Sequence, residues 1–283
     1  MPLLNPEYLE TVVSLELRTR LDSDTGTGSE KVDTVATGFL IGVPTRPTSP
    51  SEEKLEAIFL VTNRHVFENR KSMLCRFNKE EGSKRFKLDL VDASKKNLWF
   101  VHEDSKIDIA VVPIDADLLE EEGIKFKVFR PNIMAFTDIM KKLYISAGDG
   151  VYVLGFPMGL SGTIKKQVIV RGGIIARFDD EIISEKGAFL IDSTVFPGNS
   201  GGPVIFQPTI ATIDLKKPAV RKAYLLGVVS KYITYEEVAI SAQTKEPRVV
   251  FVENSGLSYV VPMDYVKEIV MKILRPDKEH EWE

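Results

Sequence analysis

Residues 196–203 read Phe196-Pro197-Gly198-Asn199-Ser200-Gly201-Gly202-Pro203, a stretch that places one hydroxyl group among glycines. Glycine tolerates positive φ angles and a close approach of other groups to its backbone. Gly198 can therefore turn its N–H toward the same point as the N–H of Ser200, where the oxyanion of a tetrahedral intermediate would lie. The stretch predicts a serine nucleophile with an oxyanion hole made by Gly198 and Ser200. The alternative is a glycine-rich turn before a strand.

A serine hydroxyl is an effective nucleophile only when a base accepts its proton and a third group orients that base. The chain has three histidines, and His65 lies just past an apolar, β-prone run, residues 58–62. His102 lies in a polar segment, where we expect a surface role, and His280 lies in the charged C-terminal tail. We therefore predict that His65 is the base.

Asp108 is a single carboxylate within an otherwise apolar run, Ile107 to Val112. Burying a charge without a partner is costly, and a hydrogen bond to a histidine would remove that cost. An exposed aspartate at the start of a strand is the alternative, but it leaves the flanking Ile107 and Ile109 unexplained. We predict that Asp108 orients His65.

Three short motifs contain these residues, and they occur in the order His, Asp, Ser that is found in chymotrypsin. They are Thr62-Asn63-Arg64-His65-Val66, Asp108-Ile109-Ala110-Val111-Val112 and Gly198-Asn199-Ser200-Gly201-Gly202-Pro203. With them the chain resembles the trypsin-like serine peptidases of the chymotrypsin fold, and within these the bacterial HtrA/Deg-like branch. Secondary matches extend the resemblance over positions 37 to 262, at residues 37–41, 155–160, 192, 227–230 and 256–262.

The resemblance implies a serine endopeptidase that works through an acyl-enzyme, with His65, Asp108 and Ser200 as the triad. Ser230 would help to hold Asp108. The backbone from Ser230 through Lys231 and Tyr232 would pair with an extended substrate as an added strand. Two alternatives stay open: a catalytically silent trypsin-like fold that acts as a binding module, and a protease that is latent until a partner binds.

The specificity pocket is expected at Thr194 and Gly256. Thr194 stands six residues before the serine, where the resemblance implies an acid in enzymes that cleave after Lys or Arg. A threonine carries no charge, and Gly256 would line the pocket without blocking it, so we expect an uncharged residue at P1, the substrate position before the scissile bond. Asn199 replaces the aspartate that binds a new N-terminus in secreted relatives, so we expect no activation by N-terminal processing.

Composition and charge fit a soluble enzyme and argue against other classes. The 283 residues are 43% hydrophobic with a formal net charge of -4, enough for a large core, whereas a nucleic-acid surface would need an excess of basic residues. No run of about 18 apolar residues occurs. We expect a protein or peptide substrate, no nucleic acid, no membrane, no metal and no cofactor.

The cellular compartment is predicted from the N-terminus and the cysteine content. The sequence starts at Met1 without a basic and apolar signal segment. Cys75 is the single cysteine, so no intramolecular disulfide can form, whereas secreted relatives of trypsin are disulfide-bonded. These features predict a cytoplasmic protein. We also expect no PDZ module, because little sequence follows Pro276.

The order of β-prone segments and turns predicts an all-β protein of two six-stranded antiparallel β-barrels, chymotrypsin-like, with a C-terminal α-helix. Residues 1–120 would form the first barrel, 121–148 a linker, 149–262 the second barrel, and 263–283 the helix and tail. The strands are expected at 12–17, 37–43, 58–61, 72–77, 86–91 and 109–114, then at 150–155, 163–175, 188–191, 203–206, 224–229 and 257–261. The helix is expected at 264–274.

Overall fold

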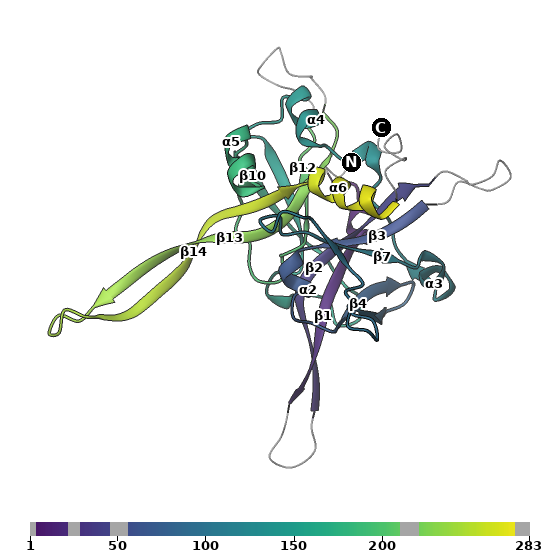
Figure 1. Ribbon diagram of the computed structural model, residues 1–283, viewed down its shortest axis with the longest axis horizontal. Helices are drawn as coiled ribbons and strands as arrows, with labels where there is room; N and C mark the ends of the chain where they lie inside the picture. The colour runs from purple at the N-terminus through teal and green to yellow at the C-terminus, as the bar shows by residue number, and fades with distance from the viewer. Residues whose placement is uncertain (1–3, 22–28, 46–55, 210–220, 275–283) are drawn as a thin grey trace.

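The computed structural model describes residues 4–21, 29–45, 56–209 and 221–274 (Figure 1). These residues form two antiparallel sheets, joined by short helices and followed by a C-terminal helix. The predicted all-β class is confirmed, as is the terminal helix, α6 (Met263–Leu274). His280 and the loop from 46 to 55 lie outside the described residues.

The N-terminal sheet has eight strands in the order β5-β4-β1-β2-β3-β7-β6, with β8 paired to β4. Two of them, β6 and β8, have only two residues each, and the six longer strands are those that the sequence predicts. The two outer strands of this order, β5 and β6, are linked through the residues next to them: the N–H of Leu98, just before β6, donates to the carbonyl of Leu90, just after β5, over 3.0 Å. The strands are β1 (Val12–Leu21), β2 (Ser29–Pro44), β3 (Glu56–Thr62), β4 (Ser72–Lys79), β5 (Ser83–Asp89), β6 (Phe100–Val101), β7 (Ala110–Ile114) and β8 (Ile124–Lys125).

The C-terminal sheet closes into a barrel in the order β10-β11-β14-β13-β12-β9. Its strands are β9 (Gly150–Gly155), β10 (Ile169–Arg177), β11 (Phe189–Asp192), β12 (Pro203–Phe206), β13 (Leu225–Ile240) and β14 (Pro247–Pro262).

Strand β10 begins at Ile169, later than the predicted start at Thr163. The preceding segment is bound to the N-terminal sheet instead. Arg76 of β4 donates to the carbonyl of Thr163 over 3.0 Å, and the Lys166 N–H donates to Asn78 Oδ1 over 2.8 Å. These contacts hold residues 163–168 between the two sheets.

Short helices connect the strands. They are α1 (Glu7–Glu10), α2 (Arg64–Phe67), α3 (Ala116–Glu121), α4 (Thr137–Lys142) and α5 (Asp180–Lys186), together with the 3-10 turns η1 (Pro131–Ile133) and η2 (Pro157–Gly159). None of the helices in the described ranges has the length and apolar character needed to cross a membrane.

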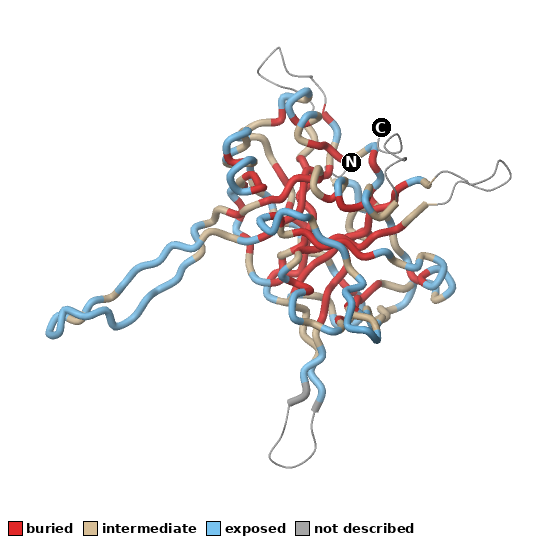
Figure 2. Tube along the Cα trace, viewed as in Figure 1, coloured by how far each residue is buried: buried red, intermediate tan, exposed pale blue. Residues whose placement is uncertain are grey.

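One hydrophobic core cluster joins the two sheets. It includes Phe39 of β2, Phe129 of the connection, Leu154 of β9 and Val228 of β13, all fully buried. Figure 2 shows buried residues concentrated where the sheets meet. Because the candidate catalytic residues come from both sheets, this shared core determines how they lie relative to one another.

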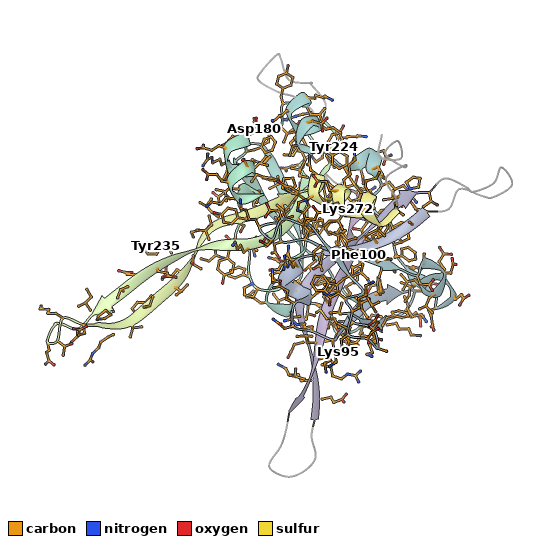
Figure 3. All side chains as sticks on the ribbon, in the orientation of Figure 1. Lys95, Phe100, Asp180, Tyr224, Tyr235 and Lys272 are labelled. Atoms are coloured by element: carbon orange, nitrogen blue, oxygen red, sulfur yellow. The ribbon has the colours of Figure 1, made fainter. Side chains whose placement is uncertain are left out.

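Strands β13 and β14 continue beyond the barrel as a hairpin that we call the arm, residues 232–254 (Figure 1). The arm projects away from the body, and Tyr235 points into solvent from it (Figure 3). The predicted strands, by contrast, end at 229 and begin again at 257. The extension is nevertheless rich in the β-branched and aromatic residues that favour strands, such as residues 249–252.

Candidate active site

His65 lies in α2, directly after β3, where the chain changes from extended to helical at Asn63. Val66 and Phe67 on the same turn are buried, so the turn is anchored while the His65 side chain stays 47% exposed. The end of a buried strand thus presents the imidazole at the surface.

Asp108 lies just before β7 and makes two contacts with His65. Its Oδ2 is 2.8 Å from His65 Nδ1, and its Oδ1 accepts a hydrogen bond of 3.1 Å from the His65 N–H. The amide of Asn63 donates to the Asp108 carbonyl over 2.8 Å. Asn63 is not among the predicted site residues. The carboxylate therefore holds both the ring and the backbone of His65.

The environment of Asp108 favours its ionised form. Burial by itself raises the pKa of this carboxyl, but the hydrogen bond and charge of His65 and the hydroxyl of Ser230 outweigh burial and lower the pKa below its usual value. A carboxylate that stays ionised keeps the proton of the neutral imidazole on Nδ1 and leaves Nε2 free as the basic nitrogen.

Ser200 lies in the loop between β11 and β12, and its hydroxyl donates to the Ser230 carbonyl over 3.2 Å. The Ser230 hydroxyl in turn donates to Asp108 Oδ2 over 2.7 Å. Within the described residues no hydrogen bond joins Ser200 to His65. Ser230 is therefore a shared neighbour of the candidate nucleophile and of the His–Asp pair, and the Ser200 hydroxyl must leave the Ser230 carbonyl to reach the imidazole.

Gly198 has a φ of 100°, and a Cβ at this position would lie 2.2 Å from the Phe156 carbonyl oxygen. Only glycine fits there. The Pro197 carbonyl accepts a 2.6 Å hydrogen bond from the Met158 N–H. Because the peptide is trans, the Gly198 N–H points to the opposite side. Among the described residues, neither this N–H nor that of Ser200 has a hydrogen-bond partner.

Thr37 of β2 binds the same loop from the other sheet. Its hydroxyl donates to the Gly198 carbonyl over 2.6 Å and accepts from the Phe156 N–H over 3.1 Å, while its own N–H donates to the Ser200 carbonyl over 2.9 Å. Thr37 is not among the predicted site residues. The sequence does contain a signal for this role, since Thr37 places a hydroxyl within the otherwise apolar run of residues 35–41. Thr37 is fully buried, and a buried hydroxyl needs a hydrogen-bond partner.

The residues predicted for the specificity pocket lie on neighbouring segments. Thr194 is exposed, and next to it the Ser193 N–H donates to the Gly256 carbonyl over 3.0 Å. The φ of Gly256 is 84°. The Asn254 amide donates to the Val195 carbonyl over 2.6 Å. The structure therefore places residues 193–195 beside residues 254–256.

The two remaining residues of the predicted substrate strand lie on β13. Tyr232 is half-buried and pairs with Ser258 of β14. Lys231 is exposed, and its Nζ lies 5.9 Å from the centre of the Tyr259 ring. Both follow Ser230 directly, on the side of the barrel where the arm begins.

His102 lies away from this cluster. Its Nε2 is 2.7 Å from the carboxylate of Glu268 on α6, and its ring packs edge-on against Tyr265 at 5.2 Å. These contacts attach the terminal helix to the N-terminal sheet.

Comparison with known families matches residues 36–207 to the trypsin-like peptidase domain. The match covers more than half of the chain, and it includes the segments that carry His65, Asp108 and Ser200.

Two curated proteins are similar to part of the chain, and both are described as probable periplasmic DegP-like serine endoproteases. The one from Rhizobium meliloti is 30% identical over 148 residues, which are 51% of this chain and 23% of the relative. The one from Chlamydia trachomatis is 26% identical over 147 residues, 52% of this chain and 23% of the relative. The alignments thus span about a quarter of each relative.

Among solved structures, the HtrA-type protease AlgW with a decapeptide aligns with 95% of this chain and 65% of its own, at 14% identity and a TM-score of 0.48. The MamO protease domain from Magnetospirillum magneticum aligns with 94% of this chain and 98% of its own, also at 14% identity and a TM-score of 0.48.

Proposed function

The chain belongs to the trypsin-like peptidase family, and from this premise we propose that it is a serine endopeptidase with Ser200 as nucleophile, His65 as general base and Asp108 as the orienting group. The observation that carries the proposal is the bonding of Asp108, whose carboxylate contacts the His65 ring at 2.8 Å and accepts from Ser230 at 2.7 Å. This geometry leaves His65 Nε2 as the nitrogen that can accept a proton.

In the first step Ser200 Oγ attacks the scissile carbonyl as its proton passes to His65 Nε2. The hydroxyl first exchanges its hydrogen bond with the Ser230 carbonyl for one with the imidazole, as active-site contacts often tighten only when substrate binds. Collapse of the tetrahedral intermediate breaks the C–N bond, and His65 returns the proton to the leaving amine. Water then hydrolyses the acyl-enzyme by the same route.

The N–H groups of Gly198 and Ser200 would stabilise the oxyanion. Two observations support this role. The hydrogen bond between Met158 and the Pro197 carbonyl sets the direction of the Gly198 N–H, and Thr37 holds the other side of the same glycine through its carbonyl. The hole is thus formed by backbone groups whose orientation is fixed before substrate arrives.

The proposed substrate is an extended segment of a protein or peptide that pairs with residues 230–232. Thr194 offers no negative charge, so the proposal includes an uncharged residue at P1. A cytoplasmic location stays a prediction, and the two curated relatives are described as periplasmic.

A fluorophosphonate probe tests the proposal, because it reacts with an activated serine and needs no knowledge of the substrate. We expect the full chain to be labelled once, at Ser200, without prior processing, and the Ser200→Ala variant to remain unlabelled but folded. A protein that unfolds cooperatively yet is never labelled would contradict the proposal and favour the silent binding module.

A further inference from the structure

A cavity of about 670 Å³ opens beside the candidate triad. Its lining includes His65, Asp108 and Ser230, together with Lys106, Lys186 and Lys231. The predicted pocket residues Thr194 and Gly256 do not contribute to it. The cavity therefore adjoins His65 and Asp108 and is distinct from the predicted P1 pocket.

The three lysines come from segments that are distant in sequence. Lys106 precedes Asp108, Lys186 is the last residue of α5, and Lys231 follows Ser230 on β13. The segments of Lys106 and Lys186 pack closely against each other. Gly187 lies so near Ile107 that an added Cβ would come within 2.2 Å of the Ile107 side chain. The fold thus brings together cations that the sequence separates.

The positive charge of this cavity is not neutralised internally. Arg64 and Glu68 also line it and pair with each other at 2.7 Å, and Asp108 is occupied by His65 and Ser230. In the described part of the chain, no carboxylate forms a salt bridge with Lys106, Lys186 or Lys231. The chain as a whole has a net charge of -4, so the local excess of cations is not a consequence of composition.

The position of the cavity indicates which substrate residues would meet it, an argument that rests on the proposed function. Successive side chains of an extended strand point to opposite faces. If the P1 side chain points toward Thr194 and Gly256, the preceding residue, P2, points to the other face, toward His65 and the cavity. P4 shares the face of P2, and P3 shares that of P1.

We propose that this cavity is an acid-binding subsite, in which Lys106, Lys186 and Lys231 select Asp or Glu at P2, with P4 on the same face. The carboxylate would lie among three ammonium groups that otherwise have no anionic partner. The ion pairs between the substrate carboxylate and these ammonium groups would be partly exposed to solvent, so their attraction is moderate and decreases as the salt concentration increases.

Matched peptides test the proposal on the full chain. They share one uncharged P1 residue and differ only by Glu, Gln or Lys at P2, and a second set carries the same changes at P3. We expect kcat/KM to be about 5- to 10-fold higher for Glu than for Gln at P2, and lower for Lys, with the difference reduced in 1 M salt. The P3 set should show little dependence on charge.

Substitution of the lysines identifies the site. Lys186→Glu should remove the preference for Glu at P2 and shift it toward Lys. Lys106→Gln should weaken the preference without reversing it. Lys245→Glu, at the exposed tip of the arm, makes the same change in net charge away from the cavity and should leave the preference intact.

Equal rates for Glu and Gln at P2, in protein that the fluorophosphonate labels at Ser200, would overturn the acid-binding subsite and leave the proposed function standing. The same preference in the Lys186→Glu variant would also overturn it. Absence of both labelling and hydrolysis would instead refute the peptidase proposal, and the subsite with it.

Discussion

The hydroxyl of Thr37 donates a 2.6 Å hydrogen bond to the carbonyl oxygen of Gly198. The two residues belong to different sheets and are 161 positions apart in the chain. Because Gly198 provides one N–H of the proposed oxyanion hole, a side chain of the N-terminal sheet helps to determine the shape of a site whose nucleophile lies in the C-terminal half.

Replacing Thr37 by Val keeps the shape of the side chain but removes the hydroxyl. The buried Gly198 carbonyl and the Phe156 N–H then lose their partner, which we expect to cost about 1–3 kcal/mol of stability. We also expect kcat to fall more than KM rises, because the Gly198 carbonyl is no longer held. Steady-state kinetics and urea unfolding measure the two effects.

Thr37→Ser is the matched control, since it retains the hydroxyl and should restore most of kcat. A valine variant that reacts with the fluorophosphonate as fast as the unmodified chain would show that Thr37 does not position the oxyanion hole.

Asp108→Asn should lower kcat on the order of 10⁴-fold, because an amide favours the wrong tautomer of His65. The variant should remain folded, which circular dichroism can check. His102→Ala is the comparison: it removes a contact with Glu268 on α6, so a small loss of stability and nearly unchanged kcat are expected. If His102→Ala were as damaging to turnover as His65→Ala, the assignment of the base would be wrong.

Lys166 should make stability depend on pH in the alkaline range. The side chain is buried and donates to the Val12 carbonyl, and burial lowers its pKa to about 8 from the ordinary 10.5. Between these values the unfolded chain holds a proton that the folded protein has released, so the free energy of unfolding rises with pH across this window.

The matched variant is Lys166→Met, which has no titrating group at this position. We expect the stability of the unmodified chain, relative to this variant, to increase by roughly 3 kcal/mol between pH 7.5 and pH 10.5. Urea unfolding of both proteins across this range measures the difference, and parallel curves would refute the prediction.

Removal of the arm should leave the body of the protein folded. Nearly all side chains from 234 to 253 are exposed, so replacing this segment by a two-residue Asn-Gly turn removes little buried surface. We expect the melting temperature to change by only a few degrees in calorimetry, with a single transition. Loss of cooperative unfolding would show instead that the arm supports the barrel.

Much of the fold follows from local patterns that the sequence displays directly. The apolar runs that form β3 and β7 are strands because β-branched and aromatic residues suit a buried sheet. Strand boundaries are harder to predict where a segment contacts residues that are distant in the sequence. Residues 163–168 include Thr163, Ile164 and Val168, which favour strands, but the segment binds Arg76 and Asn78 of the other sheet, and no local signal describes that contact.

The sequence by itself determined which groups could carry the chemistry: one serine among glycines, one histidine at the end of a strand, and one aspartate in an apolar run. Only the tertiary structure decided how they are connected. Residues that are far apart in the chain contact one another: the Ser200 hydroxyl donates to the Ser230 carbonyl, and the Thr37 hydroxyl donates to the Gly198 carbonyl. Three lysines from separate segments likewise line one cavity. Such contacts depend on how two sheets pack across a shared core, and the spacing of residues along one strand contains no record of that packing.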